Sequence, residues 1–249
     1  IKLSVLILGC LQASSKEARS FEVPITRVET LGAYPPLKFM DPDSKRRLEG
    51  TDVLMDNYAN IQYYGPLYIG TPPQNRTFLF DTGSSWVWIP VSLCSDISCP
   101  NRHFSNEQST TYSVSDQEII VRYGIGSVEG FVSNDTLSLD FEQTVAVSDF
   151  SFLSIYKAES IDDMYSDGLI GLSPREIGDK VQDLFVEDLF QQGEIPMNLF
   201  AVYLADKSAQ SYLTFGGHLE PTGGEITWIK MDSASHWQVA LASLSVGSQ

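Results

Sequence analysis

The sequence predicts an all-β protein, a barrel or a sandwich built from many short strands. From about residue 58 onward, runs rich in Tyr, Phe, Val, Ile, Thr and Leu recur between clusters of turn-forming residues. Only one segment, 180–192, has the spacing of an amphipathic helix. Hydrophobic residues make up 43% of the chain and charged residues 19%, so it can bury a core and does not have the composition of a disordered protein.

The expected elements follow one another at regular intervals. Strands are predicted at residues 62–69, 77–80, 85–89, 118–123, 127–133, 136–140, 144–152, 200–205, 211–215 and 225–230. In the helix candidate one face carries Val181, Leu184, Phe185 and Leu189, and Gly193 offers a stop. We expect this helix to pack on the core and assign it no chemistry.

Charge is unevenly distributed along the chain. The formal net charge is −16, which argues against nucleic acid and anionic membranes as partners. Residues 1–47 nevertheless hold eight Lys and Arg against five acids, whereas residues 48–249 hold eight against 27. This asymmetry suggests a basic leader that docks on an acidic body and is released when acid protonates the carboxylates. The alternative is a cleaved leader whose charge has no partner.

The first residues indicate secretion. Lys2 precedes the apolar stretch 3–11, which is too short to span a bilayer but suits a signal peptide, and Ala13 to Ser15 offer a cleavage site. We assign residues 1–18 to a signal peptide and 19–47 to a pro-segment that ends at the basic triplet Lys45-Arg46-Arg47. The folded body is expected to begin at residue 48.

The cysteines agree with secretion. Beyond Cys10 in the signal, Cys94 and Cys99 form an even pair, for which a small loop disulfide is expected in an oxidising compartment. No ligand spacing links them to the three His residues, so no metal site is predicted. Asn75 and Asn134 begin sequons and are predicted glycosylation sites, although such triplets also arise by chance.

The tripeptide Asp81-Thr82-Gly83 follows an apolar run and precedes Ser84-Ser85. A carboxylate between a strand and a Gly-containing turn lies where the backbone can present it to a cleft. The alternative is an ordinary turn, because Asp and Gly favour turns for local hydrogen bonding and for positive φ.

Several segments, in this order, resemble the pepsin-like, two-lobed aspartic proteases of eukaryotes. The resemblance rests on Tyr-Gly-Pro-Leu-Tyr-Ile-Gly-Thr-Pro-Pro-Gln at 64–74, Phe-Asp-Thr-Gly-Ser-Ser-Trp-Val-Trp-Ile-Pro at 80–90, Tyr-Gly-Ile-Gly-Ser at 123–127 and Asp-Gly-Leu-Ile-Gly-Leu at 167–172, with weaker matches at 21–27, 213–217 and 236–239. It covers almost the whole chain. It implies a pepsin-like fold with an amino-terminal β-barrel lobe over 48–222, interlobe strands, and the start of a carboxyl lobe over 223–249 that is mostly missing here.

The resemblance also implies a mechanism without a cofactor. In this family two aspartates, one per lobe, share a proton across a water that attacks the peptide bond. Asp81 would be one of them, and Thr82, Gly83 and Ser84 would support its carboxylate. Further roles are assigned to residues of three kinds: a flap formed by Tyr123, Gly124 and Gly126, Trp88 as the partner that steadies Tyr123, and Leu79, Leu169 and Ile170 as walls of the substrate cleft. Core packing would also explain these aromatic and aliphatic residues.

A second Asp-Thr-Gly or Asp-Ser-Gly does not follow Asp81 in this sequence. We therefore expect a zymogen fragment, inactive alone, of an acid endopeptidase that cleaves polypeptides between apolar residues. The full-length protein is expected to be a monomer, to bind its own pro-segment, and to be extracellular or in a lysosome- or vacuole-like acidic compartment. The alternative is a catalytically silent member of the fold that binds peptides or partners.

Overall fold

The computed structural model describes residues 51–58, 62–95, 97–100, 102–124, 126–161, 164–174, 183–204, 211–217, 229–232, 236–241 and 243. The predicted signal peptide, pro-segment and processing triplet lie outside these residues, as do residues 225–228 of the last expected strand and most of 223–249. The domain limits therefore stay predictions. Within the described ranges, no helix has the length and apolar character needed to cross a membrane.

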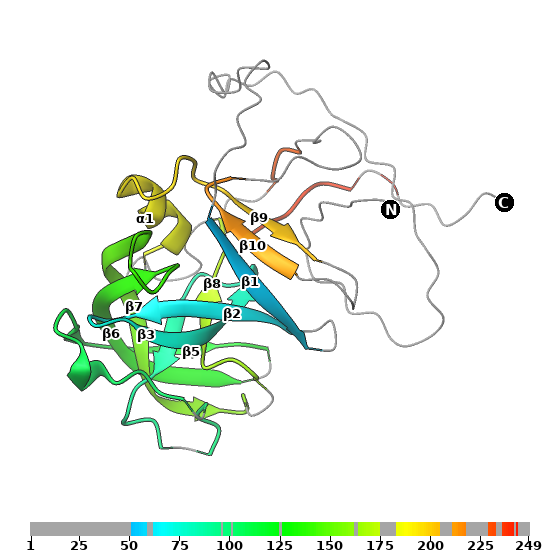
Figure 1. Cartoon of the computed structure of the whole chain (residues 1–249). Helices are drawn as coiled ribbons and strands as arrows, with labels where there is room; N and C mark the ends of the chain where they lie inside the picture. The colour runs from blue at the N-terminus through cyan, green and yellow to red at the C-terminus, as the bar shows by residue number, and fades with distance from the viewer. Residues whose placement is uncertain are drawn as a thin grey trace.

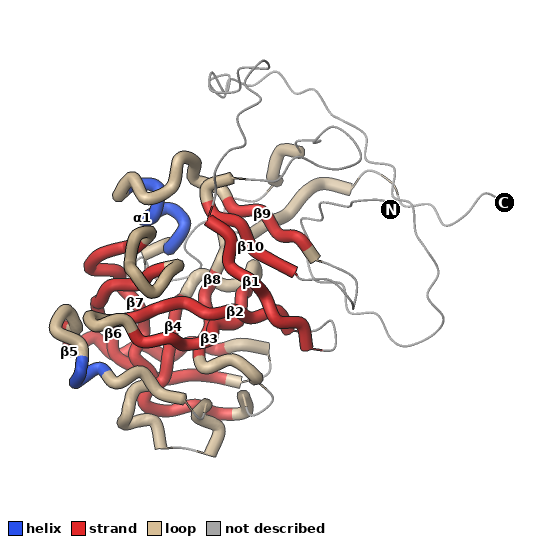
Figure 2. Tube along the Cα trace, viewed as in Figure 1, coloured by secondary structure: helices blue, strands red, loops and turns tan. Residues whose placement is uncertain are grey.

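Strands dominate the described chain, which confirms the all-β prediction (Figure 2). The strands are β1 (Thr51–Tyr58), β2 (Gln62–Ile69), β3 (Gln74–Asp81), β4 (Val87–Pro90), β5 (Ser113–Arg122), β6 (Ser127–Ser138), β7 (Ala146–Glu159), β8 (Gly168–Gly171), β9 (Phe200–Tyr203) and β10 (Ser211–Phe215). A short 3-10 helix, η1 (Asn106–Gln108), and one α-helix, α1 (Phe185–Gln191), accompany them.

Six of the strands close into a barrel. Hydrogen bonding orders the sheet as β5-β6-β7-β4-β8-β3-β2-β1-β10-β9, and β6 pairs a second time with β2 at Tyr68↔Ser138 and Ile69↔Leu137. In the sheet order, β6 and β2 are the first and last of six consecutive strands, and their additional pairing closes these six strands into a ring. β5 remains outside as an edge strand on β6, and β1, β10 and β9 extend away from the barrel (Figure 1).

β1 belongs to both parts of this sheet. Its first residues pair with β10, from Thr51↔Phe215 to Met55↔Ser211. Its last residues pair instead with β2, from Asp56↔Tyr64 to Tyr58↔Gln62. A single strand therefore connects the barrel to the β9–β10 hairpin.

The barrel separates two hydrophobic clusters, and strand alternation assigns each side chain to one of them. Successive residues of a strand point to opposite faces. In β4, Val87 and Ile89 enter the larger cluster, whereas Trp88 enters the smaller one together with Leu153 and Ile155 of β7. We call these the barrel core and the Trp88 cluster.

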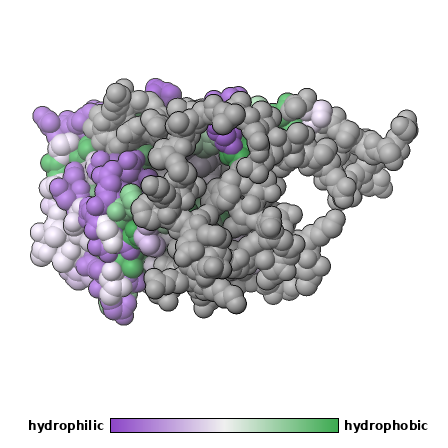
Figure 3. Space-filling view, turned by 90° about the horizontal axis from the view of Figure 1, so that it is seen from above, coloured by the Kyte–Doolittle hydropathy of each residue, from purple (hydrophilic) through white to green (hydrophobic). Residues whose placement is uncertain are grey.

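The surface of the described part is mixed in polarity. Seen from above, hydrophilic side chains surround small hydrophobic patches (Figure 3). Among the exposed large hydrophobic residues are Leu93, Ile97 and Val114, which are 73%, 99% and 55% exposed. Leu93 and Ile97 lie at the loop that carries the disulfide, and Val114 lies in β5.

α1 covers the barrel beside β7 (Figure 1). It buries Phe185 and Leu189, and the Phe185 ring meets Phe150 and Phe215 edge-on at centroid distances of 5.6 and 5.8 Å. The helix is shorter than the predicted 180–192, of which residues 180–182 lie outside the described part. Gly193 ends it with a φ of +81°, a conformation that glycine adopts at little cost.

Asp188 in α1 gives the lobe a pH-dependent contribution to stability. Burial, together with the negative charges of Asp183 and Glu187, raises the pKa of this carboxyl from its ordinary 3.8 to about 6. The folded state therefore binds the proton more tightly than the unfolded state does. The resulting stabilisation is present below pH 3.8 and is lost as the pH rises through about 6.

Asp188→Asn is expected to reduce the loss of stability between acid and neutral pH. A shift of two pKa units corresponds to about 3 kcal/mol, and the partial exposure of Asp188 lowers this to about 1–2 kcal/mol. Urea unfolding at about pH 4 and pH 7 measures the difference. Glu142→Gln changes an exposed carboxylate in the turn between β6 and β7. It should show the same change in unfolding free energy between the two pH values as the wild type. An equal change in unfolding free energy for the wild type and Asp188→Asn would contradict the prediction.

Candidate active site

Asp81 is the last residue of β3, at a place where the sheet forces an unusual connection. β8 lies between β3 and β4, parallel to β3 and antiparallel to β4. The chain leaving Asp81 must therefore cross the end of β8 before it can enter β4. Residues 82–86 make this crossing, and we call them the crossing loop.

Three successive amide groups at the end of β8 hold this part of the chain. Gly171 N–H donates to the carbonyl of Trp86 at 3.0 Å. Leu172 N–H donates to the carbonyl of Asp81 at 2.8 Å, and Ser173 N–H donates to that of Ser84 at 3.0 Å. The loop that carries the carboxylate is thus fixed through its backbone.

The crossing loop leaves no room for a side chain at Gly171. A Cβ atom there would lie 2.4 Å from the carbonyl carbon of Ser85, 2.6 Å from its Cα and 2.7 Å from the carbonyl oxygen of Ser84. Contacts this short with backbone atoms cannot be relieved by a rotamer change. Gly171 is therefore required by the close approach of two backbones.

The Asp81 carboxylate is held by its own loop. Oδ1 accepts a hydrogen bond from Gly83 N–H at 2.9 Å, and Oδ2 accepts one from the Ser84 hydroxyl at 2.5 Å. Within the described residues, the Thr82 hydroxyl makes no hydrogen bond to this carboxylate. Asp81 is half-buried, so its carboxylate is oriented by two donors and remains open to solvent.

Tyr123 lies close to this carboxylate, at the end of the β5–β6 hairpin. Its hydroxyl accepts a hydrogen bond from Trp88 Nε1 at 2.8 Å, the pair that the resemblance implied. Burial raises the pKa of the Tyr123 phenol and the negative charge of Asp81 raises it further, whereas hydrogen bonds with Trp88 and Ser84 oppose the shift. The phenol therefore keeps its proton at acid and at neutral pH.

The two glycines of the hairpin tip differ in what they require. A Cβ atom at Gly126 would lie 2.2 Å from the carbonyl oxygen of Glu159 in β7, so the close approach of β7 demands glycine there. A Cβ atom at Gly124 would meet no atom within 4 Å, and neither glycine has a positive φ. Gly126 therefore gives β7 the space to approach, whereas nothing in the structure explains Gly124, and the part of both glycines in a flap stays a prediction.

The predicted cleft walls are mostly core. Ile170 is fully buried in the barrel core, and Leu169, 5% exposed, belongs to the Trp88 cluster. Adjacent residues of β8 point to opposite faces, and both faces are covered, so these two side chains lie in different clusters. Their role as cleft walls stays a prediction. Leu79 is half-buried against the Trp88 cluster, and its role at a cleft stays a prediction.

Trp237 supports the site through a contact that the sequence did not reveal. Its Nε1–H donates to the carbonyl of Leu172 at 2.7 Å, and its ring meets Phe200 edge-on at 5.5 Å. Leu172 in turn donates its N–H to Asp81. Because 65 residues separate Trp237 from Leu172, no local pattern could signal the contact.

The remaining predicted sites are a disulfide and two glycosylation sequons. Cys94 and Cys99 form the expected disulfide. Asn75 is exposed on β3, whereas Asn134 is half-buried on β6 and its amide donates to the carbonyl of Asp149 at 3.1 Å. Glycosylation at either stays a prediction. In the part of the chain that the structure describes, His, Cys, Asp and Glu do not gather into a group that could hold a metal.

Comparison with known proteins agrees with this geometry. The model of the eukaryotic aspartyl protease family matches residues 62–249. The chain belongs to the eukaryotic aspartyl proteases. The match includes the crossing loop, the β5–β6 hairpin and β8, which are the segments that surround Asp81 in this aspartyl protease chain.

Curated aspartyl proteases resemble the chain over most of its length. It is 31% identical to pepsin A of Rhinolophus ferrumequinum, over 98% of this chain and 67% of that protein. It is 31% identical to chymosin of Callithrix jacchus, over 77% and 51%, and 36% identical to cathepsin D of Gallus gallus, over 80% and 52%. The chain thus spans between half and two thirds of the length of these relatives.

Proposed function

We propose that the protein that carries this chain is an aspartic-type endopeptidase, which hydrolyses peptide bonds between apolar residues of polypeptides at acid pH. One observation supports this most directly. The Asp81 carboxylate lies at the end of β3, oriented by Gly83 and Ser84 and adjacent to Tyr123, in a chain of the aspartyl protease family. Asp81 would be one of two catalytic carboxylates, the other lying outside this chain.

The chemistry needs one ionised and one protonated carboxyl group. The ionised carboxylate takes a proton from a water as that water attacks the peptide carbonyl, and the protonated partner donates toward the carbonyl oxygen. Two like charges at close range do not both ionise easily, so such a pair titrates as a unit. Gly83 and Ser84 would hold Asp81 in the orientation that sharing a water requires.

The β5–β6 hairpin would act as a flap. Its Tyr123 hydroxyl is fixed by Trp88 at 2.8 Å, so the aromatic ring is held beside Asp81 without a bound peptide. Closure of such a hairpin over a substrate excludes water from the reacting groups. Leu79, packed below it on the Trp88 cluster, would contribute apolar surface to the cleft.

The sequence outside the described residues fits a secreted zymogen. We propose a signal peptide at 1–18, a basic pro-segment at 19–47 that covers the acidic body, an amino-terminal lobe at 48–222 and the start of the second lobe at 223–249. In the pro-segment, Lys38 or Lys45 would lie against the carboxylates until acid releases it. The mature protein would be a monomer in an extracellular or lysosome-like acidic compartment, glycosylated at Asn75 and Asn134.

The test is proteolysis by the protein translated from the full-length transcript. After acidification it should degrade an unfolded protein substrate, and Asp81→Asn should lower the rate by about a thousandfold or more, because amide cannot replace an acid–base carboxylate. Glu142→Gln, an exposed carboxylate in the turn between β6 and β7, is the matched control and should keep full activity.

Two outcomes would overturn the proposal. Undiminished proteolysis by Asp81→Asn would show that Asp81 is not catalytic. A protein that lacks a second aspartate and degrades nothing would favour a catalytically silent peptide-binding protein, which the absence of another Asp-Thr-Gly or Asp-Ser-Gly in this sequence leaves open.

A further inference from the structure

A groove of about 340 Å³ lies between the loop after β4 and the strands β5, β6 and β7. Its walls include Val91 and Leu93 from that loop, Val114 of β5, Phe131 of β6, and Ser154 and Tyr156 of β7. We call this the β5 groove. Its size falls within the range of sites that bind a side chain or a small ligand.

The β5 groove lies on the opposite face of the sheet from Tyr123 and Trp88. In β6, Val132 packs into the Trp88 cluster, whereas its neighbour Phe131 lines the groove. In β7, Leu153 and Ile155 belong to the same cluster, and Ser154 between them lines the groove. Since neighbouring residues point to opposite faces, a molecule in the groove would leave the Asp81 cleft free.

The walls of the groove are suited to an apolar side chain. The rings of Phe131 and Tyr156 form one wall, with centroids 5.4 Å apart, and Leu93 and Val114 form exposed lips. Two hydroxyl groups of the lining, those of Tyr112 and Ser154, are bonded to each other at 3.2 Å, and they lie 3.0 and 2.7 Å from the buried hydroxyl of Ser133. Because these hydroxyls already have partners, the lining does not require a polar group from a ligand.

Among the described residues no strand pairs with the outer edge of β5, which runs beside the groove. β5 is the last strand of the sheet on its side, and its pairing with β6 is interrupted between Val114 and Glu118. Edge strands offer backbone donors and acceptors to a further strand, and peptides are commonly recognised in this way, with an adjacent pocket selecting a side chain. The bulge and the acidic residues of β5 would also discourage the β5 edges of two copies of the chain from pairing with each other.

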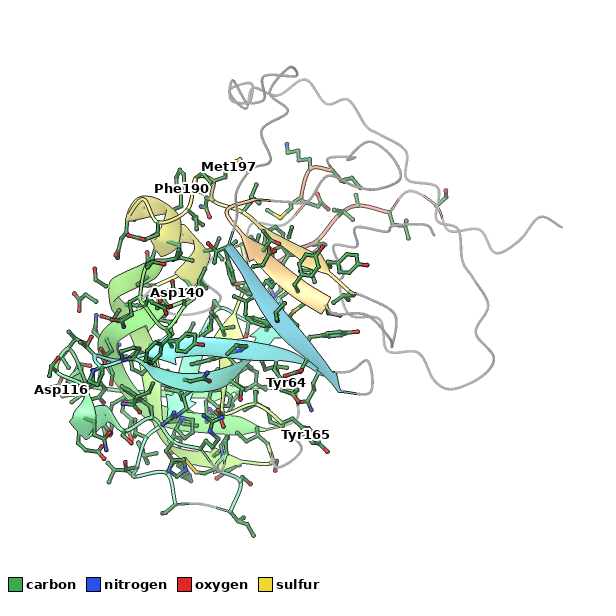
Figure 4. The ribbon with its side chains drawn as sticks, in the orientation of Figure 1. Tyr64, Asp116, Asp140, Tyr165, Phe190 and Met197 are labelled. Carbon is green, nitrogen blue, oxygen red and sulfur yellow. A yellow bond between two sulfur atoms is a disulfide. The ribbon has the colours of Figure 1, made fainter. Side chains whose placement is uncertain are left out.

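Charge around the groove is acidic. Asp116 and Glu118 are exposed on β5, at the outer side of the molecule where Figure 4 labels Asp116, and Glu107 is exposed on η1. Tyr156 donates to Glu118. Among the described residues no Lys or Arg lines the groove, and the nearby Lys157 is paired with Glu129 at 2.7 Å and Glu159 at 3.2 Å. A strand docked here would be favoured by basic residues.

From this juxtaposition we propose that the β5 groove is a docking site for an extended polypeptide segment in which basic residues flank an apolar side chain. The segment adds to the free edge of β5, its apolar side chain enters between Leu93 and Phe131, and its basic residues face Asp116 and Glu118. Calling that polypeptide a substrate rests on the proposed endopeptidase function. The docking itself does not.

The test uses the chain with Asp81→Asn and a fluorescent, end-blocked peptide of sequence Ala-Lys-Ala-Leu-Ala-Lys-Ala, in which both Lys side chains lie on the same face of a strand as Leu. Binding is followed by fluorescence anisotropy and mapped by NMR. The peptide should bind at low salt and perturb amides of β5 and residues 91–93. Replacing its Leu by Ala, or Leu93→Gln in the protein, should weaken binding about tenfold, the expected loss for one buried aliphatic contact. Asp116→Lys should weaken it about threefold.

Ile97→Gln is the matched control. Ile97 lies on the same loop and is 99% exposed but does not line the groove, so its replacement should change affinity less than twofold. Equal effects of Leu93→Gln and Ile97→Gln would overturn the proposal, as would peptide-induced shifts centred on Asp81, self-association at the groove in place of peptide binding, or no binding. These readouts involve no catalysis, so their failure is distinct from failure of the endopeptidase proposal.

Discussion

Gly171→Ala should unfold the lobe or expel the crossing loop from its position. The added methyl group would meet backbone atoms of Ser85 at 2.4 and 2.6 Å, and the same loop is fixed by the amide groups of Leu172 and Ser173. Neither side can move without breaking hydrogen bonds that hold Asp81. We expect a loss of about 3 kcal/mol or more in the free energy of unfolding, at the upper end for overpacking.

Gly124→Ala provides the control for this result. A Cβ atom there meets nothing within 4 Å, and the backbone does not have a positive φ, so stability should change by no more than about 0.5 kcal/mol. Urea unfolding measures both variants at acid pH. If the two substitutions cost the same, the close crossing of the loop over β8 cannot be what fixes the Asp81 backbone.

Phe185→Ala should cost about 3–5 kcal/mol of unfolding free energy, the range for removing a buried aromatic ring. Phe185 is 1% exposed, and its ring contacts Phe150 of β7 and Phe215 of β10. It therefore joins the helix to the barrel and to the strand that pairs with β1. Loss of the ring should destabilise the helix, the barrel and β10 together. Far-ultraviolet circular dichroism and tryptophan fluorescence should therefore report one cooperative unfolding transition, at a lower urea concentration than in the wild type.

The same helix supplies the matched substitution. Phe190→Ala removes the same number of atoms from a side chain that is 44% exposed and lies on the outer part of α1 (Figure 4). Its cost should stay below about 1 kcal/mol. Similar losses for Phe185→Ala and Phe190→Ala would mean that α1 does not pack on the barrel through Phe185.

Local patterns predicted the strands best where one face is buried. The limits of β2 and β10 agree with the predicted 62–69 and 211–215. The prediction of two strands at 127–133 and 136–140 was wrong, because β6 continues through Asn134-Asp135. These polar residues suggested a turn, yet the carboxylate of Asp135 is buried and accepts hydrogen bonds from Thr111 and Thr136.

Two strands were missed for a different reason. β8 has only four residues, too few for a visible alternation, and its strand character comes from pairing with β3 and β4. β1 contains Asp and Asn, which are poor strand formers, and it depends on β10 and β2 for partners. In both strands the decisive contacts are distant in sequence, so a local window could not contain them.

The same distinction between local and distant contacts applies to the candidate site. The support of Asp81 by Gly83 and Ser84 is local, and the motif predicted it. The contacts of Gly171 with Ser85 and of Trp237 with Leu172 join residues far apart in the chain. The burial of Leu169 and Ile170 likewise depends on what covers each face of β8, which the apolar character of the segment could not indicate.

The double membership of β1 has a consequence for synthesis in the cell. Met55 pairs with Ser211, so a ribosome that adds about 5–20 residues per second needs on the order of 10–30 s between producing the two partners. During that time the nascent chain holds half of β1 without its neighbour, and unpaired edges at this stage promote association between chains. The junction between barrel and hairpin therefore cannot form until β10 has been synthesised, well after the strands of the barrel.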